Sequence, residues 1–290
     1  MKNFNVFYII TNRIKDKDLS LTRQIADYIQ NRGGTCYVRD DFLSGQEENP
    51  RHTDPSIIPQ EVECILVLGG DGTLLQAARD VLDRQIPLLG VNLGTLGYLA
   101  EIKRQSIYPA LDRLMQGKYK LERRMMLQGS VYRGKELLGQ DIALNDIVIS
   151  RQGGLRVVNL NTYVNKSRLT SYRADGVIVS TPTGSTGYSL SAGGPIISPA
   201  ASLFLMTPLS AHTLNSRSVV LPPENEISIE IGSGRDEQPE EAVVYFDSDT
   251  CVSMVTGDRV VITRSFKDTL IVKVHSSSFL EVLSKKMRNA

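Results

Sequence analysis

The sequence has few of the residues that mark disulfide-rich and metal-binding proteins. It contains three cysteines and three histidines in 290 residues. Cys36, Cys64 and Cys251 are too far apart for metal-ligand spacing, and their odd count does not fit a disulfide framework. The three histidines share no metal-binding spacing either. We therefore expect buried thiols and no fixed metal site made by the protein alone.

An excess of one charge and a long hydrophobic run are also missing. The formal net charge is +1, so no overall basic field favours nucleic acid or an anionic membrane as a partner. The apolar run Val6–Ile10 is too short for a signal-peptide core or a membrane span. We therefore expect a cytoplasmic protein. The composition, 41% hydrophobic and 22% charged, predicts a globular protein, and the length of 290 residues predicts about two domains.

Strand and helix patterns alternate in the first part of the chain. Strands are predicted at residues 5–11, 35–38, 64–68 and 86–91, with helices near 21–29, 74–82 and 108–115. This alternation predicts a Rossmann-like α/β domain over residues 1–118. From 119 to 270 short strands repeat, with a hairpin turn at Asn165-Lys166, which predicts a mostly β, sandwich-like domain. The segment 271–290 ends in a helical pattern and is expected to return to the first domain.

A glycine-rich turn follows the strand at 64–68, with the sequence Gly69-Gly70-Asp71-Gly72-Thr73. Glycine permits positive φ and close backbone approach, Thr73 can cap the next helix, and a helix N-terminus favours an anion, so phosphate is the expected guest. Asp71 is itself an anion and must meet a cation or a proton. The spacing matches neither the dinucleotide fingerprint nor the Walker loop. A tight structural turn with Asp71 as a local cap is the alternative.

Two further stretches carry polar side chains beside predicted strands. In "RADGVIVSTPTGSTGYSLSAGGP", residues 173–195, hydroxyl and N–H groups can bind ribose or phosphate, and Tyr188 can stack on a base. A plain surface loop is the alternative there. Asn145-Asp146 interrupts a strand pattern in "ALNDIVIS", where a bulge or a strand-edge turn is the alternative.

In this order, the glycine-rich turn, Asn145-Asp146 and the segment 175–195 resemble the NAD kinase family. The segments "GVNLGTLGYL" and "TPLSAHTLNSRSVVLP" also look like that family's connecting segments, whereas residues 12–62 carry no resemblance. The resemblance implies transfer of the ATP γ-phosphoryl group to the adenosine-ribose 2′-hydroxyl of NAD, which gives NADP. It also implies Mg²⁺ or another divalent cation bound with ATP, and a homodimer or homotetramer.

The resemblance assigns roles to individual residues. Asp71 is implied to accept the 2′-hydroxyl proton, and Gly69, Gly70, Gly72 and Thr73 are implied to approach the donor phosphates. The residues implied to bind NAD are Asp71, Gly72, Asn145, Asp146, Arg156, Arg173, Asp175, Thr186, Gly187, Tyr188, Ser189, Leu190 and Ser191. The sequence departs from the family at Asp146, where Glu is commoner, and at Gly187, where Ala is usual. Asp247 and Asp249, in "FDSDT" where many relatives have Asp-Gly, and His212 stay open as site residues.

Two other functions share part of this pattern. A lipid kinase of the diacylglycerol or sphingosine type has a similar glycine-rich turn and an α/β-plus-β plan, but it needs an apolar acceptor groove, and the stretch around Tyr188 is polar. A non-catalytic dinucleotide sensor would have no need of Asp71. The motifs fit ATP or polyphosphate as the donor and NAD or NADH as the acceptor, and they leave feedback by NADP open.

Overall fold

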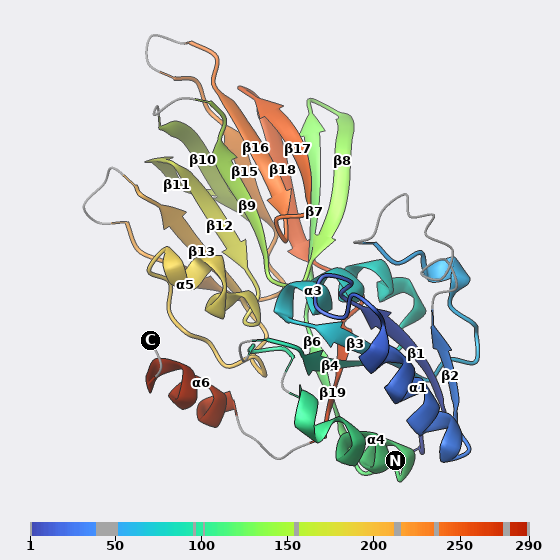
Figure 1. Ribbon diagram of the computed structural model, residues 1–290. Helices are drawn as coiled ribbons and strands as arrows, with labels where there is room; N and C mark the ends of the chain where they lie inside the picture. Colours follow the sequence, from blue (N-terminus) through green and yellow to red (C-terminus); the bar gives the residue numbers. More distant parts are fainter. Residues whose placement is uncertain are drawn as a thin grey trace. The chain divides into compact units, whose positions relative to one another are not determined.

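The computed structural model describes residues 2–38, 52–94, 97–100, 102–153, 157–211, 216–234, 238–274 and 279–288. The chain divides into two compact units, Met1–Arg124 with Lys267–Ala290, and Met125–Phe266 (Figure 1). The first unit is α/β and the second is mostly β, which confirms the predicted fold class. No helix in the described ranges combines the length and the apolar character needed to cross a membrane.

The first unit is built on a seven-stranded sheet in the order β2-β1-β3-β4-β19-β6, with β5 also paired to β4. Its strands are β1 (Val6–Thr11), β2 (Thr35–Val38), β3 (Cys64–Gly69), β4 (Leu88–Asn92), β5 (Ile102–Lys103), β6 (Lys120–Arg124) and β19 (Thr269–Lys273). Its helices are α1 (Ser20–Asn31), α3 (Asp71–Asp80), α4 (Ile107–Met115) and α6 (Phe279–Arg288), with single 3₁₀ turns η1 (Pro55–Ile57), η2 (Leu82–Arg84) and η3 (Arg104–Ser106).

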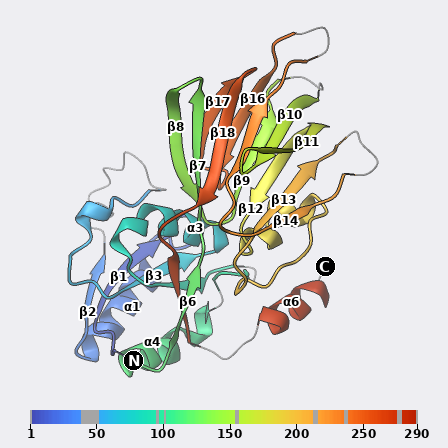
Figure 2. The ribbon, with the colours of Figure 1, turned by 180° about the vertical axis from the view of Figure 1, so that it is seen from behind.

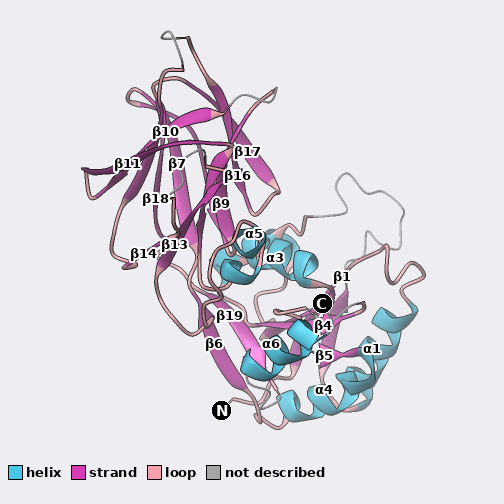
Figure 3. Cartoon of the chain, turned by 90° about the vertical axis from the view of Figure 1, so that its left-hand side faces the viewer, coloured by secondary structure: helices cyan, strands magenta, loops and turns pink. Residues whose placement is uncertain are grey.

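Both faces of this sheet are covered by helices (Figure 3). Apolar residues of α1 and α4, such as Ile25 and Leu111, share one buried cluster with Leu89 and Val91 of β4. Gly90 points the opposite way, because side chains alternate along a strand, and a methyl group on it would lie 3.1 Å from Leu74 of α3. Central parallel strands covered on both faces explain why β3 is an unbroken apolar run.

The bounds of the first unit along the chain differ from the boundaries predicted from sequence, at residues 118 and 270. Strand β6 pairs antiparallel with β19, and β19 pairs parallel with β4, so both strands belong to the sheet of the first unit. The chain therefore leaves this unit after Arg124 and re-enters it at Lys267. Helix α6 follows in the same unit, where the Phe279 ring lies 6.4 Å from the Tyr98 ring, between centroids.

The second unit contains two six-stranded antiparallel sheets (Figure 2). One has the order β11-β10-β15-β18-β7-β8 and the other β14-β13-β12-β9-β16-β17. The strands are β7 (Leu127–Arg133), β8 (Glu136–Ala143), β9 (Asp146–Arg151), β10 (Val158–Val164), β11 (Ser167–Ala174), β12 (Gly176–Ser180), β13 (Phe204–Leu209), β14 (Val219–Leu221), β15 (Ile227–Ile231), β16 (Glu241–Phe246), β17 (Thr250–Val255) and β18 (Asp258–Arg264), and between β12 and β13 lie η4 (Gly184–Thr186) and α5 (Tyr188–Ser191).

One buried cluster joins the two sheets. It combines Leu160 and Ile262 of the first sheet with Ile149, Val177 and Phe246 of the second. Apolar residues of two antiparallel sheets that meet in one core make a β-sandwich, as the sequence predicts.

Candidate active site

The predicted glycine-rich turn connects β3 to α3. Helix α3 begins at Asp71 and Gly70 is its N-cap. The prediction that Thr73 caps this helix from the N-cap position is therefore wrong, because the helix begins two residues earlier. Thr73 occupies the third helical position, where its Oγ1 accepts the Gly70 N–H at 3.5 Å and the Asn12 amide at 3.2 Å.

The glycines of this turn are needed for space and not for unusual backbone angles. None of Gly69, Gly70 and Gly72 has positive φ, in contrast to the expectation from sequence. A methyl group on Gly69 would lie 2.2 Å from Thr73 Oγ1, so only glycine lets the strand end approach the helix this closely. A methyl group on Gly72 would meet nothing within 4 Å. The backbone at Gly72 is therefore open to a ligand.

The Asp71 carboxylate is held by main-chain amides. Its Oδ2 accepts the Tyr98 N–H at 2.7 Å, and its Oδ1 accepts the Leu99 and Ala100 N–H groups at 3.1 and 3.0 Å. We call these three N–H groups the amide cradle. These neutral donors fix the orientation of the carboxylate, and the predicted cation or proton partner of Asp71 stays a prediction. Asp71 is half-buried, so part of the residue is exposed.

Gly97 makes room for the amide cradle. A methyl group on Gly97 would lie 1.9 Å from Asp71 Oδ1 and 2.5 Å from its carboxyl carbon. Such distances are far inside ordinary contact, so any side chain at residue 97 would displace the carboxylate.

In the second unit, Asn145 lies in the turn between β8 and β9, Asp146 begins β9, and Asp247 holds both residues. The Asp247 carboxylate accepts the N–H groups of Leu144, Asn145 and Asp146 at 2.7, 2.8 and 3.1 Å. Asp247 and Ser248 have φ of 49° and 59°, the backbone of a type I′ hairpin turn between β16 and β17. This turn aims the Asp247 side chain at the neighbouring strand β9.

Asp146 is a buried acid with an unusual proton affinity. Asp146 is only 4% exposed. Burial, together with the negative charge of Asp247, raises the pKa of Asp146 from 3.8 to about 7. Near neutral pH its carboxyl group can therefore donate a hydrogen bond as well as accept one.

The hydroxyl-rich segment after β12 meets the Asn145-Asp146 turn. Thr181 Oγ1 donates to the Leu144 carbonyl at 2.6 Å, and the Thr181 N–H donates to the Asn145 carbonyl at 2.9 Å. A methyl group on Gly187 would lie 3.5 Å from Asn145 Nδ2 and 3.8 Å from Asp146 Oδ2. Two of the predicted motifs, separate in sequence, thus form one surface in this unit.

Several hydroxyls of this segment bond inside the protein. Ser185 Oγ donates to the Pro182 carbonyl at 2.7 Å, Thr186 Oγ1 donates to the Thr183 carbonyl at 3.2 Å, and the buried Ser189 Oγ lies 3.1 Å from Thr207 Oγ1. These bonds shape the turn. Tyr188, Leu190 and Ser191 are exposed and can meet a ligand.

The remaining predicted site residues lie elsewhere in the second unit or outside the described residues. Asp175 Oδ1 pairs with Arg151 Nε at 2.8 Å, and Arg173 is exposed on β11. Asp249 donates its N–H to the Phe246 carbonyl within the I′ turn. Arg156 and His212 fall outside the described residues.

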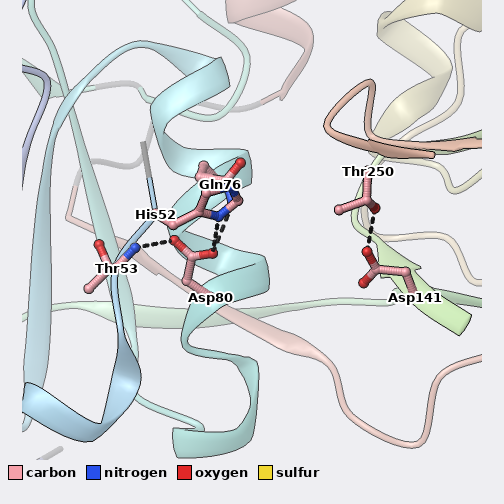
Figure 4. A network of polar contacts seen from close by, with 6 residues as sticks. All are labelled: His52, Thr53, Gln76, Asp80, Asp141 and Thr250. Carbon is pink, nitrogen blue, oxygen red and sulfur yellow. Dashed lines mark hydrogen bonds and ion pairs between the residues drawn. The ribbon is translucent and has the colours of Figure 1, made fainter. Parts of the chain in front are cut away.

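The described residues contain no group of three or more His, Cys, Asp or Glu side chains that could hold a metal ion. His52 instead joins a polar network on α3, where its Nδ1 lies 3.2 Å from Asp80 Oδ1 and 2.9 Å from Gln76 Nε2 (Figure 4). Asp80 Oδ2 also accepts the Thr53 N–H at 2.7 Å. This network fixes the chain ahead of η1 against α3.

The chain thus combines an α/β unit that carries a glycine-rich turn with a β-sandwich unit. Comparison with known proteins identifies its class and its family. Residues 7–119 match the ATP-NAD kinase N-terminal domain, and residues 144–274 match the ATP-NAD kinase C-terminal domain. The chain belongs to the NAD kinase family.

Curated relatives agree with this assignment, and solved structures share the fold. The chain is 50% identical to an NAD kinase of Agathobacter rectalis over 283 residues, 98% of both chains, and 45% identical to one of Lachnospira eligens, over 97% of this chain and 99% of the relative. Its fold resembles that of yeast NADH kinase complexed with NADH (TM-score 0.85, 23% identity, 99% of this chain and 89% of that one). It also resembles an NAD kinase from Archaeoglobus fulgidus in complex with ATP (TM-score 0.77, 20% identity, 98% of this chain and 99% of that one).

Sequence reasoning did not find the amide cradle and left Asp247 open. The cradle consists of backbone groups, which no residue type encodes; the only trace is the glycine at 97 in "GVNLGTLGYL". Asp247 lies 101 positions after Asp146, so its contacts follow from the pairing of β16 with β9. Pairing of that kind is not encoded in any local pattern.

Proposed function

We propose that this protein is an ATP-dependent NAD kinase that phosphorylates the adenosine-ribose 2′-hydroxyl. The observation that supports this best is the Asp71 carboxylate, which three amides orient at the mouth of an open glycine turn. A sensor that only binds a dinucleotide would have no use for a carboxylate oriented at this position.

In the proposed reaction, Asp71 accepts the proton of the 2′-hydroxyl. The 2′ oxygen forms a bond to the γ-phosphorus while the bond from that phosphorus to the β,γ-bridging oxygen breaks, and ADP leaves. In a loose transition state the nucleophile's proton departs late, so the carboxylate contributes mainly by orienting the hydroxyl. The amide cradle maintains that orientation.

The donor phosphates are proposed to approach the backbone of Gly69, Gly70, Gly72 and Thr73, where α3 begins. A helix N-terminus presents free N–H groups and a positive dipole end to an anion. Mg²⁺ or another divalent cation is proposed to arrive with ATP as part of the substrate, since magnesium commonly binds through phosphates. It neutralises phosphate charge as the bond breaks.

In the second unit, NAD is proposed to contact the surface made by Asn145, Asp146 and the turn from Thr186 to Ser191. Tyr188, which is 48% exposed, can stack on a base, and a partly protonated Asp146 can hydrogen-bond a ribose hydroxyl as donor or acceptor. Ser189 is buried and its hydroxyl bonds to Thr207, so its proposed role is to hold the turn that carries Tyr188. Arg173 and Asp175 are proposed to reach the nicotinamide side, with Arg156 as a further candidate.

The test is NADP formation by the purified protein from ATP, Mg²⁺ and NAD, read with an NADP-specific dehydrogenase. Parallel reactions offer polyphosphate as donor, NADH as acceptor, or diacylglycerol and sphingosine as lipid acceptors. Asp71→Asn should lower turnover on the order of 10² to 10⁴ while the protein remains folded. Lipid phosphorylation with NAD left unchanged would reject the proposal, and NAD binding without turnover would establish a sensor.

We also propose a cytoplasmic homodimer or homotetramer. All three cysteines lie in the described residues and are unpaired, as expected where thiols are kept reduced. Burial raises the pKa of Cys36 to about 12, so this thiol stays protonated. Sedimentation at several concentrations gives the oligomeric state.

A further inference from the structure

The C-terminal helix α6 lies against the first residue of the amide cradle, Tyr98. The Phe279 ring lies 6.4 Å from the Tyr98 ring, between centroids, and the Lys286 ammonium lies 4.1 Å from the centre of the same ring. Phe279 and Lys286 are seven residues apart, about two helical turns, so they lie on one face of α6. The Tyr98 side chain therefore meets this helix at two points along its length.

Helix α6 turns one face toward the first unit but is not deeply packed. Val282, Leu283 and Lys286 are half-buried, whereas the neighbouring Lys285 is exposed. None of the described residues of α6 is fully buried, so burial of apolar area contributes little to holding this helix. A cation over an aromatic face is worth more as water is excluded from it, and Lys286 is the lysine of this pair that is partly withdrawn from solvent.

The three donors of the amide cradle are anchored in different ways. Leu99 and Ala100, whose N–H groups bind Asp71 Oδ1, are 4% and 1% exposed, so the core of the first unit anchors their side chains. Tyr98, whose N–H donates to Asp71 Oδ2 at 2.7 Å, is only half-buried, and Gly97 before it has no side chain to anchor. The contacts with α6 are therefore what hold the Tyr98 end of the cradle.

We propose that α6 holds the amide cradle against Asp71, with Lys286 as a positioning residue that acts through the Tyr98 ring. This inference rests on the proposed function, in which the Asp71 carboxylate orients the 2′-hydroxyl. The ammonium attracts the negative face of the ring and restricts the Tyr98 side chain. The N–H of the same residue is restricted with it, and so is the carboxylate oxygen that accepts this N–H.

The first test measures hydrogen exchange of the Tyr98, Leu99 and Ala100 amides by NMR, because exchange reports local opening of the cradle. Lys286→Met removes the cation but keeps an unbranched side chain, and it should speed exchange of the Tyr98 amide about fivefold. Lys285→Met is the matched control, since it removes an equal charge from the same turn at an exposed position. Lys285→Met should exchange like the wild type, and so should Lys286→Arg, which keeps a cation for the ring.

The second test separates positioning from a general effect on stability. In Lys286→Met the kcat for NADP formation should fall about twofold to fivefold while the KM values for NAD and ATP stay unchanged, because only the orientation of Asp71 is altered. Lys286→Arg should restore kcat. In an Asp71→Asn background, Lys286→Met should lower kcat no further, because the two changes act on one unit.

Four results would overturn the inference. They are unchanged exchange of the Tyr98 amide in Lys286→Met, an equal increase in Lys285→Met, an increase that extends to the amides of the central strand β3, and faster exchange at Tyr98 with unchanged kcat. Exchange is measured without turnover, so it decides whether α6 holds the cradle even if the wild-type protein made no NADP. That separate result would reject the proposed function.

Discussion

Substituting Gly97 tests whether main-chain amides position the Asp71 carboxylate for catalysis. In Gly97→Ala the new methyl group would lie 1.9 Å from Asp71 Oδ1, so carboxylate and loop must separate by more than about 1 Å to reach ordinary contact. A misplacement of about 1 Å at a reacting group can cost about 10²-fold in rate. The separation also weakens hydrogen bonds to a charged group, each contributing about 1.5–3 kcal/mol. We expect kcat to fall about 10²-fold, with a modest loss of stability.

The assay is steady-state NADP formation, with melting temperatures to exclude unfolding. The control is the double variant Gly97→Ala/Asp71→Asn. If Gly97 acts only through Asp71, the double variant is scarcely slower than Asp71→Asn alone, because the two changes act on one unit. Wild-type turnover in Gly97→Ala would refute the positioning role of the amide cradle. Two losses that multiply would show that Gly97 affects turnover by another route.

Three further predictions concern the second unit and assembly. The pKa of Asp146 is about 7 in the folded state, whereas its ordinary value is 3.8. Between these two pH values the folded state keeps a proton that the unfolded chain has lost. The stability of the wild type therefore falls as pH rises from about 4 to about 7. Asp146→Asn removes this loss, so its stability relative to wild type should rise by about 2–3 kcal/mol between pH 5 and pH 8 in urea titrations; a pH-independent difference would contradict the raised pKa. Tyr188→Ala should weaken NAD binding by about 1–3 kcal/mol and ATP binding less, by calorimetry; equal weakening would place Tyr188 elsewhere. Mixing Asp71→Asn with Asp175→Ala under subunit exchange should restore part of the activity if the two residues serve one site from different chains. Activity that stays at the level of the separate variants, with exchange verified by a mass tag, would place both in the same chain.

The fold class could be predicted from sequence because its signals are local. Buried strands of a parallel sheet are continuous apolar runs, and β2 begins and ends where the pattern predicts, at Thr35 and Val38. The hairpin turn at Asn165-Lys166 is also present, with φ of 50° and 67° at its two residues. The unit boundary at Arg124 had no such signal. Strand β6 is a short polar sequence, and it belongs to the first unit only because β19, about 145 residues later, pairs with it.

In the candidate site, too, the features with a local sequence signal could be predicted and the others could not. Residue types predicted the glycine-rich turn, Asn145-Asp146 and the Tyr188 segment, because each requires particular side chains in a short stretch. The amides that hold Asp71 could not be predicted, because backbone N–H groups are common to all residues except proline. The raised pKa of Asp146 also has no local signal, since burial and a remote acid, Asp247, cause it.

Asp71 and Asp247 are positioned by the same physical means. Each carboxylate accepts three consecutive backbone N–H groups, from residues 98–100 and from residues 144–146. Consecutive amides form a concave anion site whatever side chains they carry, so this requirement does not restrict the side chains at the donor positions. The restriction falls on the neighbouring glycines instead. A methyl group would lie 1.9 Å from Asp71 Oδ1 at Gly97 and 2.1 Å from the Asn145 carbonyl oxygen at Gly184. The positions that must remain glycine in these two turns are therefore those where any side chain would intrude. This accounts for glycine at residues 97 and 184, which lie in segments by which the sequence resembles its family.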